Sequence, residues 1–298
     1  MSSATNYCAG GSGVDVSLSG SQAGITYQLY NGAAPVGAPM SGTGSALDFG
    51  MQLAPGTYTV MANNAATTCT NNMSNSVSIT VNPLPVLVAV TGGGSYCAGG
   101  SGVHIGVGGS VSGIRYDLYN GSTLSGSMTG SGGSLDFGLK TAAGTYIVVA
   151  TNAATLCART MSGSAVVSIN AVPVTFTMAG GGSYCAGGAG ADIALAGSQS
   201  GVNYQLYNSG LPTGSPMSGT GSALDFGMRT ASGVYTITGT NTTTGCNSSM
   251  SGSATINVLT APTVFTVTGG GAYCNGSGGV HIGLSGSTSG IRYQYWWQ

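Results

Sequence analysis

The chain has 298 residues, of which 4% are charged, and its formal net charge at pH 7 is −1. Five basic residues cannot neutralise a run of phosphates or hold an anionic membrane surface, so we exclude nucleic-acid binding and polybasic membrane attachment. The 55 glycines have no three-residue period, which excludes collagen, and the 42% of apolar residues alternate with polar ones, which excludes a disordered chain.

The chain begins with MSSATNYC, which lacks the basic and apolar regions of a secretory signal peptide. We interpret this as a signal that has been removed or lies outside the sequence. No run of about 18 apolar residues occurs, so we predict no membrane-spanning helix. Regularly spaced cysteines in a chain with few charges indicate an oxidising, extracellular location, either secreted or at the cell surface.

Internal repeats organise the whole sequence. Four cysteines recur at intervals of 89, 88 and 89 residues (97 − 8, 185 − 97 and 274 − 185). A unit of this length buries a modest core of its own. We therefore divide the chain into repeat 1 (1–84, without a first strand), repeat 2 (85–172), repeat 3 (173–261) and a partial repeat 4 (262–298, with its first three strands only).

Repeat 2 shows the strands of a complete unit in chain order. Apolar residues alternate with polar ones in six segments, which are bounded by turns rich in Gly, Ser, Asn and Thr. Such short alternating segments predict an all-β sandwich. The segments are PVLVAV (85–90), GVHIGV (102–107), GIRYDLY (113–119), SLDFGL (134–139), GTYIVVAT (144–151) and SAVVSIN (164–170).

A Gly-x-Tyr motif opens the fifth segment of each full repeat and resembles the tyrosine corner of immunoglobulin-like domains. Its tyrosines are Tyr58, Tyr146 and Tyr235. In antibody domains a cysteine stands two residues later, but here Val60, Val148 and Ile237 stand there, so that disulfide between the sheets is absent. Tyr27, Tyr116 and Tyr204 stand where antibody domains bury a tryptophan.

Four motifs together resemble the tandem immunoglobulin-like repeats of large bacterial cell-surface adhesins and secreted filament proteins. They are GGGSYCAGGSGV (92–103), GTGSALDFG (42–50), AAGTYIVVATNAATLC (142–157) and MSGSAVVSIN (161–170). The resemblance implies immunoglobulin-like β-sandwiches stacked end to end, serving as stalks, fibres or adhesive arrays. It carries over no catalytic residue, no metal site and no cofactor.

The seven cysteines fall into two classes, and neither class has the spacing of a zinc site. First-class cysteines precede the second strand, and second-class cysteines follow the tyrosine strand. The first class is Cys8, Cys97, Cys185 and Cys274, and the second is Cys69, Cys157 and Cys246.

Three regular disulfide pairings are open. Pairs within a repeat would be 8–69, 97–157 and 185–246, pairs across a linker would be 69–97, 157–185 and 246–274, and forward pairs would be 8–157 and 97–246. Seven strands of alternating direction place the two classes at opposite ends of a sandwich, and end-to-end stacking then favours the forward pairs. One extra strand would restore the pairs within a repeat, and free buried thiols are a further alternative.

Odd and even repeats differ at two surface positions. His104 and His281 stand where odd repeats have Asp15 and Asp192, and Arg115 and Arg292 stand where odd repeats have Thr26 and Asn203. These residues alternate with core positions, so we expect them to point outward. Either they are idle surface residues, or odd and even repeats make different lateral contacts in which Asp meets His or Arg.

Aromatic residues supply the other candidate interface. Tyr30, Tyr119 and Tyr207 are predicted to be exposed on the third strand, and Trp296 and Trp297 lie near the last residue. Exposed tyrosines suit an interface or a sugar-binding ledge. Asp48, Asp136 and Asp225 in the LDFG motifs are predicted to bond local backbone rather than calcium.

Enzyme chemistry finds no support in the sequence. The two histidines lie on equivalent surfaces of different repeats without a partner to orient them, and no paired carboxylates are evident. We therefore predict a non-catalytic structural or adhesive protein that forms an extracellular filament, stalk or surface fibre with itself as partner. A module that binds surface glycans is the alternative.

The partial repeats at the two ends of the sequence allow two interpretations. Either the sequence is a window on a longer array, or chains join head to tail. In the second case residues 263–270 would fill the first-strand position in repeat 1 of another copy. The apolar side chains of repeat 4 are expected to stay half exposed, because three strands cannot enclose a core.

Overall fold

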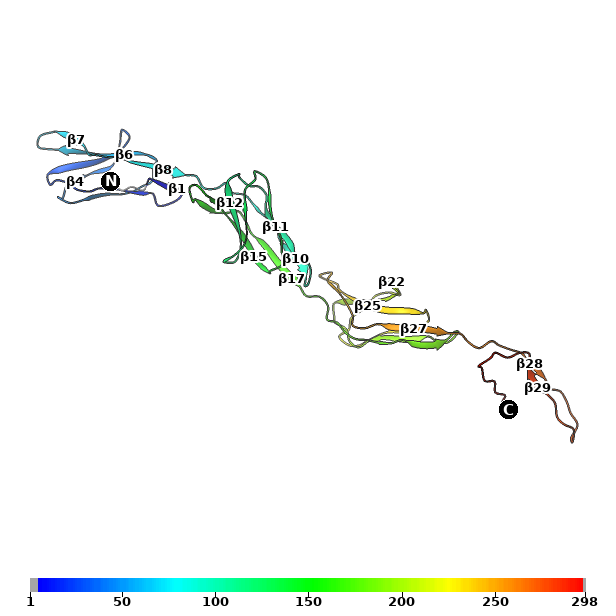
Figure 1. The fold of residues 1–298 in the computed structure, drawn as a ribbon. Coiled ribbons are helices and arrows are strands. Elements are labelled where there is room, and N and C mark those ends of the chain that lie inside the picture. Colours follow the sequence, from blue (N-terminus) through cyan, green and yellow to red (C-terminus); the bar gives the residue numbers. More distant parts are fainter. Residues whose placement is uncertain (1–4, 297–298) are drawn as a thin grey trace. The chain divides into compact units, whose positions relative to one another are not determined.

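The computed structural model describes residues 5–296, and all of the regular elements in this part are β-strands. The predicted all-β class is therefore confirmed. The chain divides into two compact units, Met1–Ile169 and Asn170–Gln298 (Figure 1). Because residues 5–296 contain no helix, they contain none that is long and apolar enough to cross a membrane.

Repeat 1 is a sandwich of two sheets. The larger sheet has the order β1-β8-β6-β3-β4 with β7 beside β6, and the smaller sheet pairs β2 with β5. β1 runs parallel to β8, whereas the other neighbouring strands are antiparallel. The strands are β1 (Asn6–Cys8), β2 (Val14–Leu18), β3 (Ile25–Asn31), β4 (Ala34–Ser41), β5 (Leu47–Gln52), β6 (Gly56–Asn64), β7 (Thr70–Asn72) and β8 (Val77–Asn82).

Repeat 2 has the same larger sheet, in the order β10-β17-β15-β12-β13 with β16 beside β15. Its smaller sheet has three strands in the order β14-β11-β9, so β11 is paired on both edges. The strands are β9 (Val90–Gly92), β10 (Gly94–Cys97), β11 (Val103–Val107), β12 (Ile114–Asn120), β13 (Thr123–Thr129), β14 (Leu135–Lys140), β15 (Gly144–Asn152), β16 (Ala158–Thr160) and β17 (Ala165–Asn170).

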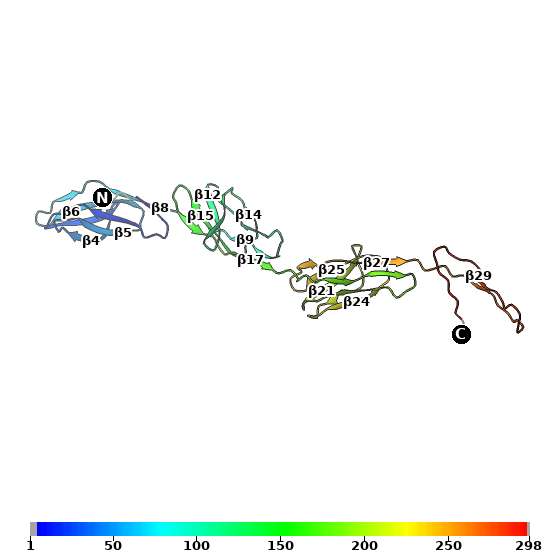
Figure 2. The ribbon, with the colours of Figure 1, turned by 60° about the horizontal axis from the view of Figure 1, so that its bottom comes forward.

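Repeat 3 pairs β19-β27-β25-β21-β22 in one sheet, with β23 and β26 at its side, and β18-β20-β24 in the other. Figure 2 shows β25 and β27 in one layer and β24 in the other. The strands are β18 (Met178–Gly180), β19 (Gly182–Cys185), β20 (Ala191–Leu195), β21 (Val202–Asn208), β22 (Leu211–Pro212), β23 (Met217–Ser218), β24 (Leu224–Arg229), β25 (Gly233–Asn241), β26 (Asn247–Ser249) and β27 (Ala254–Leu259).

Each sandwich has its own core, built from side chains at alternate positions of facing strands. In repeat 2 the core includes Ile105, Tyr116 and Val148, and none of these three has any exposed surface. The other two cores are formed by buried residues between Val14 and Ile79 and between Met178 and Ile256. The fold is a tandem array of immunoglobulin-like β-sandwiches, as the alternation of apolar residues together with the family resemblance implies.

Two buried tyrosines in each sandwich form hydrogen bonds between their hydroxyls and the backbone of nearby turns. The hydroxyls of Tyr58, Tyr146 and Tyr235 donate to the carbonyls of Ala54, Ala142 and Ala231 at 2.8, 2.9 and 2.8 Å. This bond back to the residue four positions upstream has the geometry of a tyrosine corner. The hydroxyls of Tyr27, Tyr116 and Tyr204 accept from the backbone N–H groups of Gln22, Val111 and Gln199 at 2.8, 3.0 and 2.8 Å.

Three kinds of strand were not predicted from the sequence. The first carries the first-class cysteine (β1, β10, β19), the second forms a hairpin with the third predicted strand (β4, β13), and the third follows the second-class cysteine (β7, β16, β26). The first and third kinds are only three or four residues long, and β4 and β13 bury no side chain fully. None of them therefore shows apolar alternation, which is the signal that marks a strand in a sequence.

Repeat 4 forms less structure than expected. It has only two strands, β28 (Val267–Gly269) and β29 (Ile282–Leu284), and within the described part of GIRYQYW there is no strand, so the predicted third strand is wrong. The prediction of half-exposed apolar side chains is confirmed, since Val280, Ile282, Leu284, Ile291 and Tyr293 are between 38% and 64% exposed.

Candidate functional site

A disulfide joins Cys8 of repeat 1 to Cys157 of repeat 2. The two Cα atoms lie 5.5 Å apart, which is an ordinary distance for a disulfide, and the cysteines are 149 residues apart in the sequence. This is the first of the two forward pairs. The bond therefore connects two consecutive sandwiches covalently.

Strand pairing brings these two cysteines together. Cys8 ends β1 and lies opposite Asn82, at the end of the last strand of repeat 1, and the Ala9 N–H donates to the Asn82 carbonyl at 2.9 Å. The chain then crosses a short linker, and Ala89 forms a bridge with Ser162, just beyond β16. Because Cys157 lies in the turn that leads into β16, the linker places it beside Cys8.

The other five cysteines are in two different states, and neither state is confined to one class. Cys97 and Cys246 are also disulfide-bonded, whereas Cys69, Cys185 and Cys274 are free and exposed. These states exclude every predicted pair within a repeat and every pair across a linker, because each of those pairs needs a free cysteine or Cys157, which is bound to Cys8.

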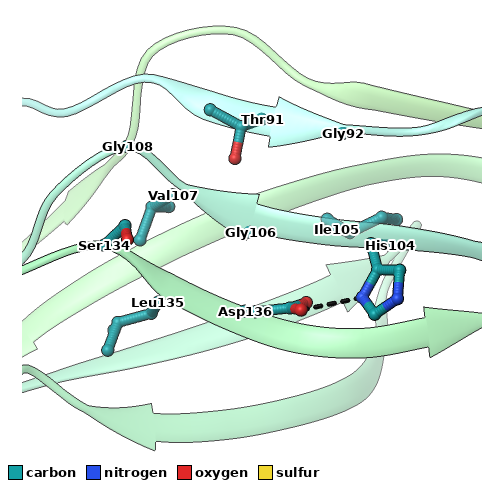
Figure 3. A pocket seen from close by; sticks show the side chains of 10 residues that line it. All are labelled: Thr91, Gly92, His104, Ile105, Gly106, Val107, Gly108, Ser134, Leu135 and Asp136. Carbon is teal, nitrogen blue, oxygen red and sulfur yellow. Dashed lines mark hydrogen bonds and ion pairs between the residues drawn. The ribbon is translucent and has the colours of Figure 1, made fainter.

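His104 and Asp136 form an exposed ion pair on the smaller sheet of repeat 2 (Figure 3). The His104 Nδ1 atom lies 2.7 Å from the Asp136 Oδ2 atom, and the Gly138 N–H donates to the other carboxylate oxygen at 2.8 Å. The backbone hydrogen bond from Gly138, together with His104 and Lys140, lowers the pKa of Asp136. His104 is thus engaged inside its own repeat.

In repeats 1 and 3, two aspartates lie at the positions that His104 and Asp136 occupy in repeat 2. A hydrogen bond to Asp48, followed by desolvation and by repulsion between the two carboxylates, raises the pKa of Asp15. In repeat 3, desolvation and then the hydrogen bond to Asp225 raise the pKa of Asp192. The expectation that the chain has no paired carboxylates is therefore wrong.

The LDFG aspartates also behave as turn residues. The N–H groups of Gly50, Gly138 and Gly227 donate to the aspartates two residues earlier at 2.7, 2.8 and 2.6 Å, which confirms the predicted bond to local backbone. Within residues 5–296 no group of three or more His, Cys, Asp or Glu side chains is placed to hold a metal ion.

Arg115 reaches an unexpected buried carboxylate on its own strand. The Arg115 Nη2 and Nε atoms lie 2.8 and 2.9 Å from Asp117 Oδ2, and the Ser127 hydroxyl donates to Oδ1 at 2.6 Å. Asp117 is only 4% exposed. Odd repeats have Gln28 and Gln205 at this position, each donating to backbone carbonyls instead. Arg115 therefore makes its charged contact within repeat 2, and the predicted lateral role stays a prediction.

The aromatic candidates divide into two groups. Tyr30, Tyr119 and Tyr207 are half-buried on strands that are paired on both sides, so the expectation that they are exposed is wrong. Trp296 is 82% exposed, and His281 and Arg292 are exposed as well. Trp297 lies outside the described residues.

No family model and no curated protein matches the chain. Among solved structures, it is similar to the three N-terminal domains of the highly immunogenic outer capsid protein Hoc of bacteriophage RB49, with 13% identity, a TM-score of 0.34, and coverage of 83% of this chain and 95% of that one.

Two ectodomain structures are similar to a comparable degree. The full ectodomain (Ig1–Ig3) of mouse nectin-like molecule 4 gives 14% identity and a TM-score of 0.38 over 88% of this chain and 99% of that one. The ICAM-5 D1–D4 ectodomain fragment gives 17% identity and a TM-score of 0.38 over 87% and 75%. At these identities and TM-scores the likeness carries no argument about function.

We expect Arg115→Thr to destabilise repeat 2 by about 1–3 kcal/mol, because the buried Asp117 carboxylate loses its charged partner. Hydrogen exchange of the repeat 2 core amides measures the loss, and repeats 1 and 3 in the same sample are the controls. The double variant Arg115→Thr/Asp117→Gln reproduces the Thr26 and Gln28 pair of repeat 1. It should recover most of the stability, and an equal loss in both variants would contradict this account.

We expect His104→Asp to raise the pKa of Asp136 from its wild-type value, because the imidazole that hydrogen-bonds to this carboxylate is replaced by a second carboxylate. In the wild type, the pKa of Asp136 is lower in the folded repeat than in the unfolded chain. Its carboxylate therefore stabilises repeat 2 at pH values above the unfolded pKa, and this stability is lost as the pH falls through the folded pKa. A smaller depression of the Asp136 pKa leaves less stability to be lost in acid, so the free energy of unfolding of the variant repeat depends less on pH in this range.

Carbon-detected NMR titration of the side-chain carboxyls measures this change. The Asp192 carboxyl in repeat 3 serves as an unaltered internal reference. An Asp136 titration curve that stays the same in the variant would show that His104 does not act on this carboxyl.

Proposed function

We propose that the chain is a non-catalytic structural or adhesive repeat protein of an extracellular filament, stalk or surface fibre, of the kind found in bacterial adhesins. The Cys8–Cys157 disulfide is the observation that carries this proposal. A covalent bond between consecutive sandwiches adds little to the folding of either one, but it prevents them from swinging apart under load. In a protein that transmits force along its length, such a bond keeps consecutive domains together.

Three further features support the same function. Disulfides persist in oxidising compartments, which suits secretion or display on a cell surface. A chain with 4% charged residues has little electrostatic repulsion between copies, so it associates readily. The four-repeat division at residues 84/85, 172/173 and 261/262 gives each full repeat one core, and we propose these as the domain boundaries.

Electron microscopy of the purified chain tests the proposal. We expect rods or fibres whose length is the same at low salt and at about 1 M salt, because few charges exist to be screened. A glycan array is run on the same preparation. Dispersed monomers that bind a defined glycan would overturn the filament and favour a glycan-binding module.

We also propose that Cys97 and Cys246 bond to each other, because their separation of 149 residues (246 − 97) equals that of Cys8 and Cys157. Peptide mapping under non-reducing conditions should find this pair.

We expect the double variant Cys8→Ser/Cys157→Ser to loosen the junction between repeats 1 and 2 while both sandwiches stay folded. Hydrogen exchange measures the folding of each sandwich, and the distance between two fluorophores measures the junction. Unfolding of repeat 1 or repeat 2 in this variant would contradict a junction role.

A further inference from the structure

We infer that the edge strand β13 of repeat 2 is a self-association site, at which two copies of the chain pair their β13 strands antiparallel about a twofold axis. This inference rests on the proposed self-association of the chain and names the surface through which copies join side by side.

β13 (Thr123–Thr129) forms an edge of the larger sheet in repeat 2, and among the strands of residues 5–296 it pairs only with β12. It has seven residues and carries no charged side chain. Leu124 is 55% exposed, and Ser127 and Thr129 are exposed as well. A long, uncharged edge strand presents unpaired N–H and C=O groups to which another strand can add.

The register of the sheet decides which backbone groups of β13 face the open edge. The Gly130 N–H donates to the Ile114 carbonyl at 2.7 Å, and hydrogen-bonded and non-hydrogen-bonded pairs alternate along an antiparallel ladder. Counted back from Gly130, Ser127 and Thr129 stand at non-hydrogen-bonded positions of the pairing with β12. Their N–H and C=O groups therefore point away from β12.

The other two full repeats carry proline along the same edge. Pro35 and Pro39 in repeat 1 correspond to Pro212 and Pro216 in repeat 3, 177 residues later (212 − 35 and 216 − 39). Proline has no N–H, so within a sheet it is tolerated where that group would face away from the neighbouring strand. These prolines leave the sheet intact and remove donors from its edge, which protects the edge from pairing.

Repeat 2 lacks this protection. Leu124 and Ser127 stand in β13 where repeat 1 has Pro35 and Pro39 in β4. Both residues of repeat 2 keep the backbone N–H that the prolines remove. Of the three sandwiches in the described part of the chain, repeat 2 is therefore the one whose larger sheet can accept a further strand here.

The adjacent edge strand β14 of the smaller sheet is already blunted. The Gly138 N–H donates to the Asp136 carboxylate at 2.8 Å, and a bulge interrupts the ladder beside it. The Lys140 Nζ atom extends from β14 and donates to the Ser125 carbonyl at 3.0 Å. Because lysine at an edge discourages pairing, the available part of β13 is the segment that follows Ser125.

A second copy of the same strand fits this segment. With a twofold axis at Met128, Ser127 of each copy lies opposite Thr129 of the other, and each of these pairs exchanges two N–H···O=C hydrogen bonds. The Met128 side chain packs against the core of repeat 2. In the pair it faces Met128 of the second copy, so the larger sheets of the two copies continue into one another.

The charges beside β13 favour a second copy as the occupant. Within one copy, Asp117 lies opposite Ser127 and Arg115 lies opposite Thr129, and the Arg115 guanidinium is 2.8 Å from the Asp117 carboxylate. In the twofold pair, Arg115 of one copy shares a row of side chains with Asp117 of the other. Like charges therefore do not face each other across the junction.

Two substitutions at one position separate the backbone donor from the side chain. Ser127→Pro removes the N–H, as Pro39 does in repeat 1. Ser127→Ala is the matched control, because both variants lose the hydroxyl that donates to Asp117, whereas alanine keeps the N–H. Analytical ultracentrifugation of the full chain, with the free thiols alkylated, measures association, and exchange of the Val148 core amide checks that repeat 2 stays folded.

Hydrogen exchange of the wild type locates the contact without any substitution. The Ser127 and Thr129 amides should exchange freely in dilute solution and become protected as the protein concentration rises. The Gly130 amide, which is bonded within repeat 2, should stay protected at every concentration. Protection of Ser127 and Thr129 that does not change with concentration would overturn the self-pairing.

We expect the wild type and Ser127→Ala to associate, and Ser127→Pro to associate at least about tenfold more weakly, because half of the hydrogen bonds between the copies are lost. Equal association of the two variants would overturn this inference. Fibres that form equally in all three proteins would also overturn it and leave the filament proposal standing, whereas chains that stay monomeric in every case would overturn both.

Discussion

The parallel pairing of β1 with β8 is the interaction on which the junction depends. It holds Cys8 opposite Asn82, where the polypeptide leaves repeat 1. The same pairing of β19 with β27 holds Cys185 opposite Leu259 in repeat 3. Cys8 and Cys185 thus each lie where the chain leaves the repeat, and the linker that follows Cys8 leads to the repeat that contains its partner Cys157.

The sequence predicts the parts of this fold that have a periodic signal. Alternating segments such as GVHIGV contain the core strands, and the Gly-x-Tyr motif locates Tyr146 and its hydrogen bond. The three-residue strand NYC has no room for alternation, and its partner lies about 70 residues away, so neither its existence nor its direction is visible in the sequence. Repeat spacing and end-to-end stacking favour the forward pairing without reference to this strand, and the Cys8–Cys157 bond agrees with them.

The carboxylate pairs show a second limit of sequence analysis. A bulge interrupts the pairing of β2 with β5 between Asp15 and Ser17, and equivalent bulges occur in repeats 2 and 3. The bulge brings together side chains that are 33 residues apart (48 − 15). One backbone geometry thus holds two carboxylates in odd repeats, where the pKa of Asp15 is raised, and a His–Asp pair in repeat 2, where the pKa of Asp136 is lowered.

A chain with so few charges has no long-range field to orient one repeat against the next. Orientation must then come from short-range contacts, and in this protein the linker supplies them. Residues 88–92 connect repeat 1 to repeat 2 and also pair with Ser162 and β11, so the segment that joins two sandwiches also completes the second one. The sandwiches of repeats 2 and 3 thus each take one edge strand, β9 or β18, from the segment that leads in from the preceding repeat.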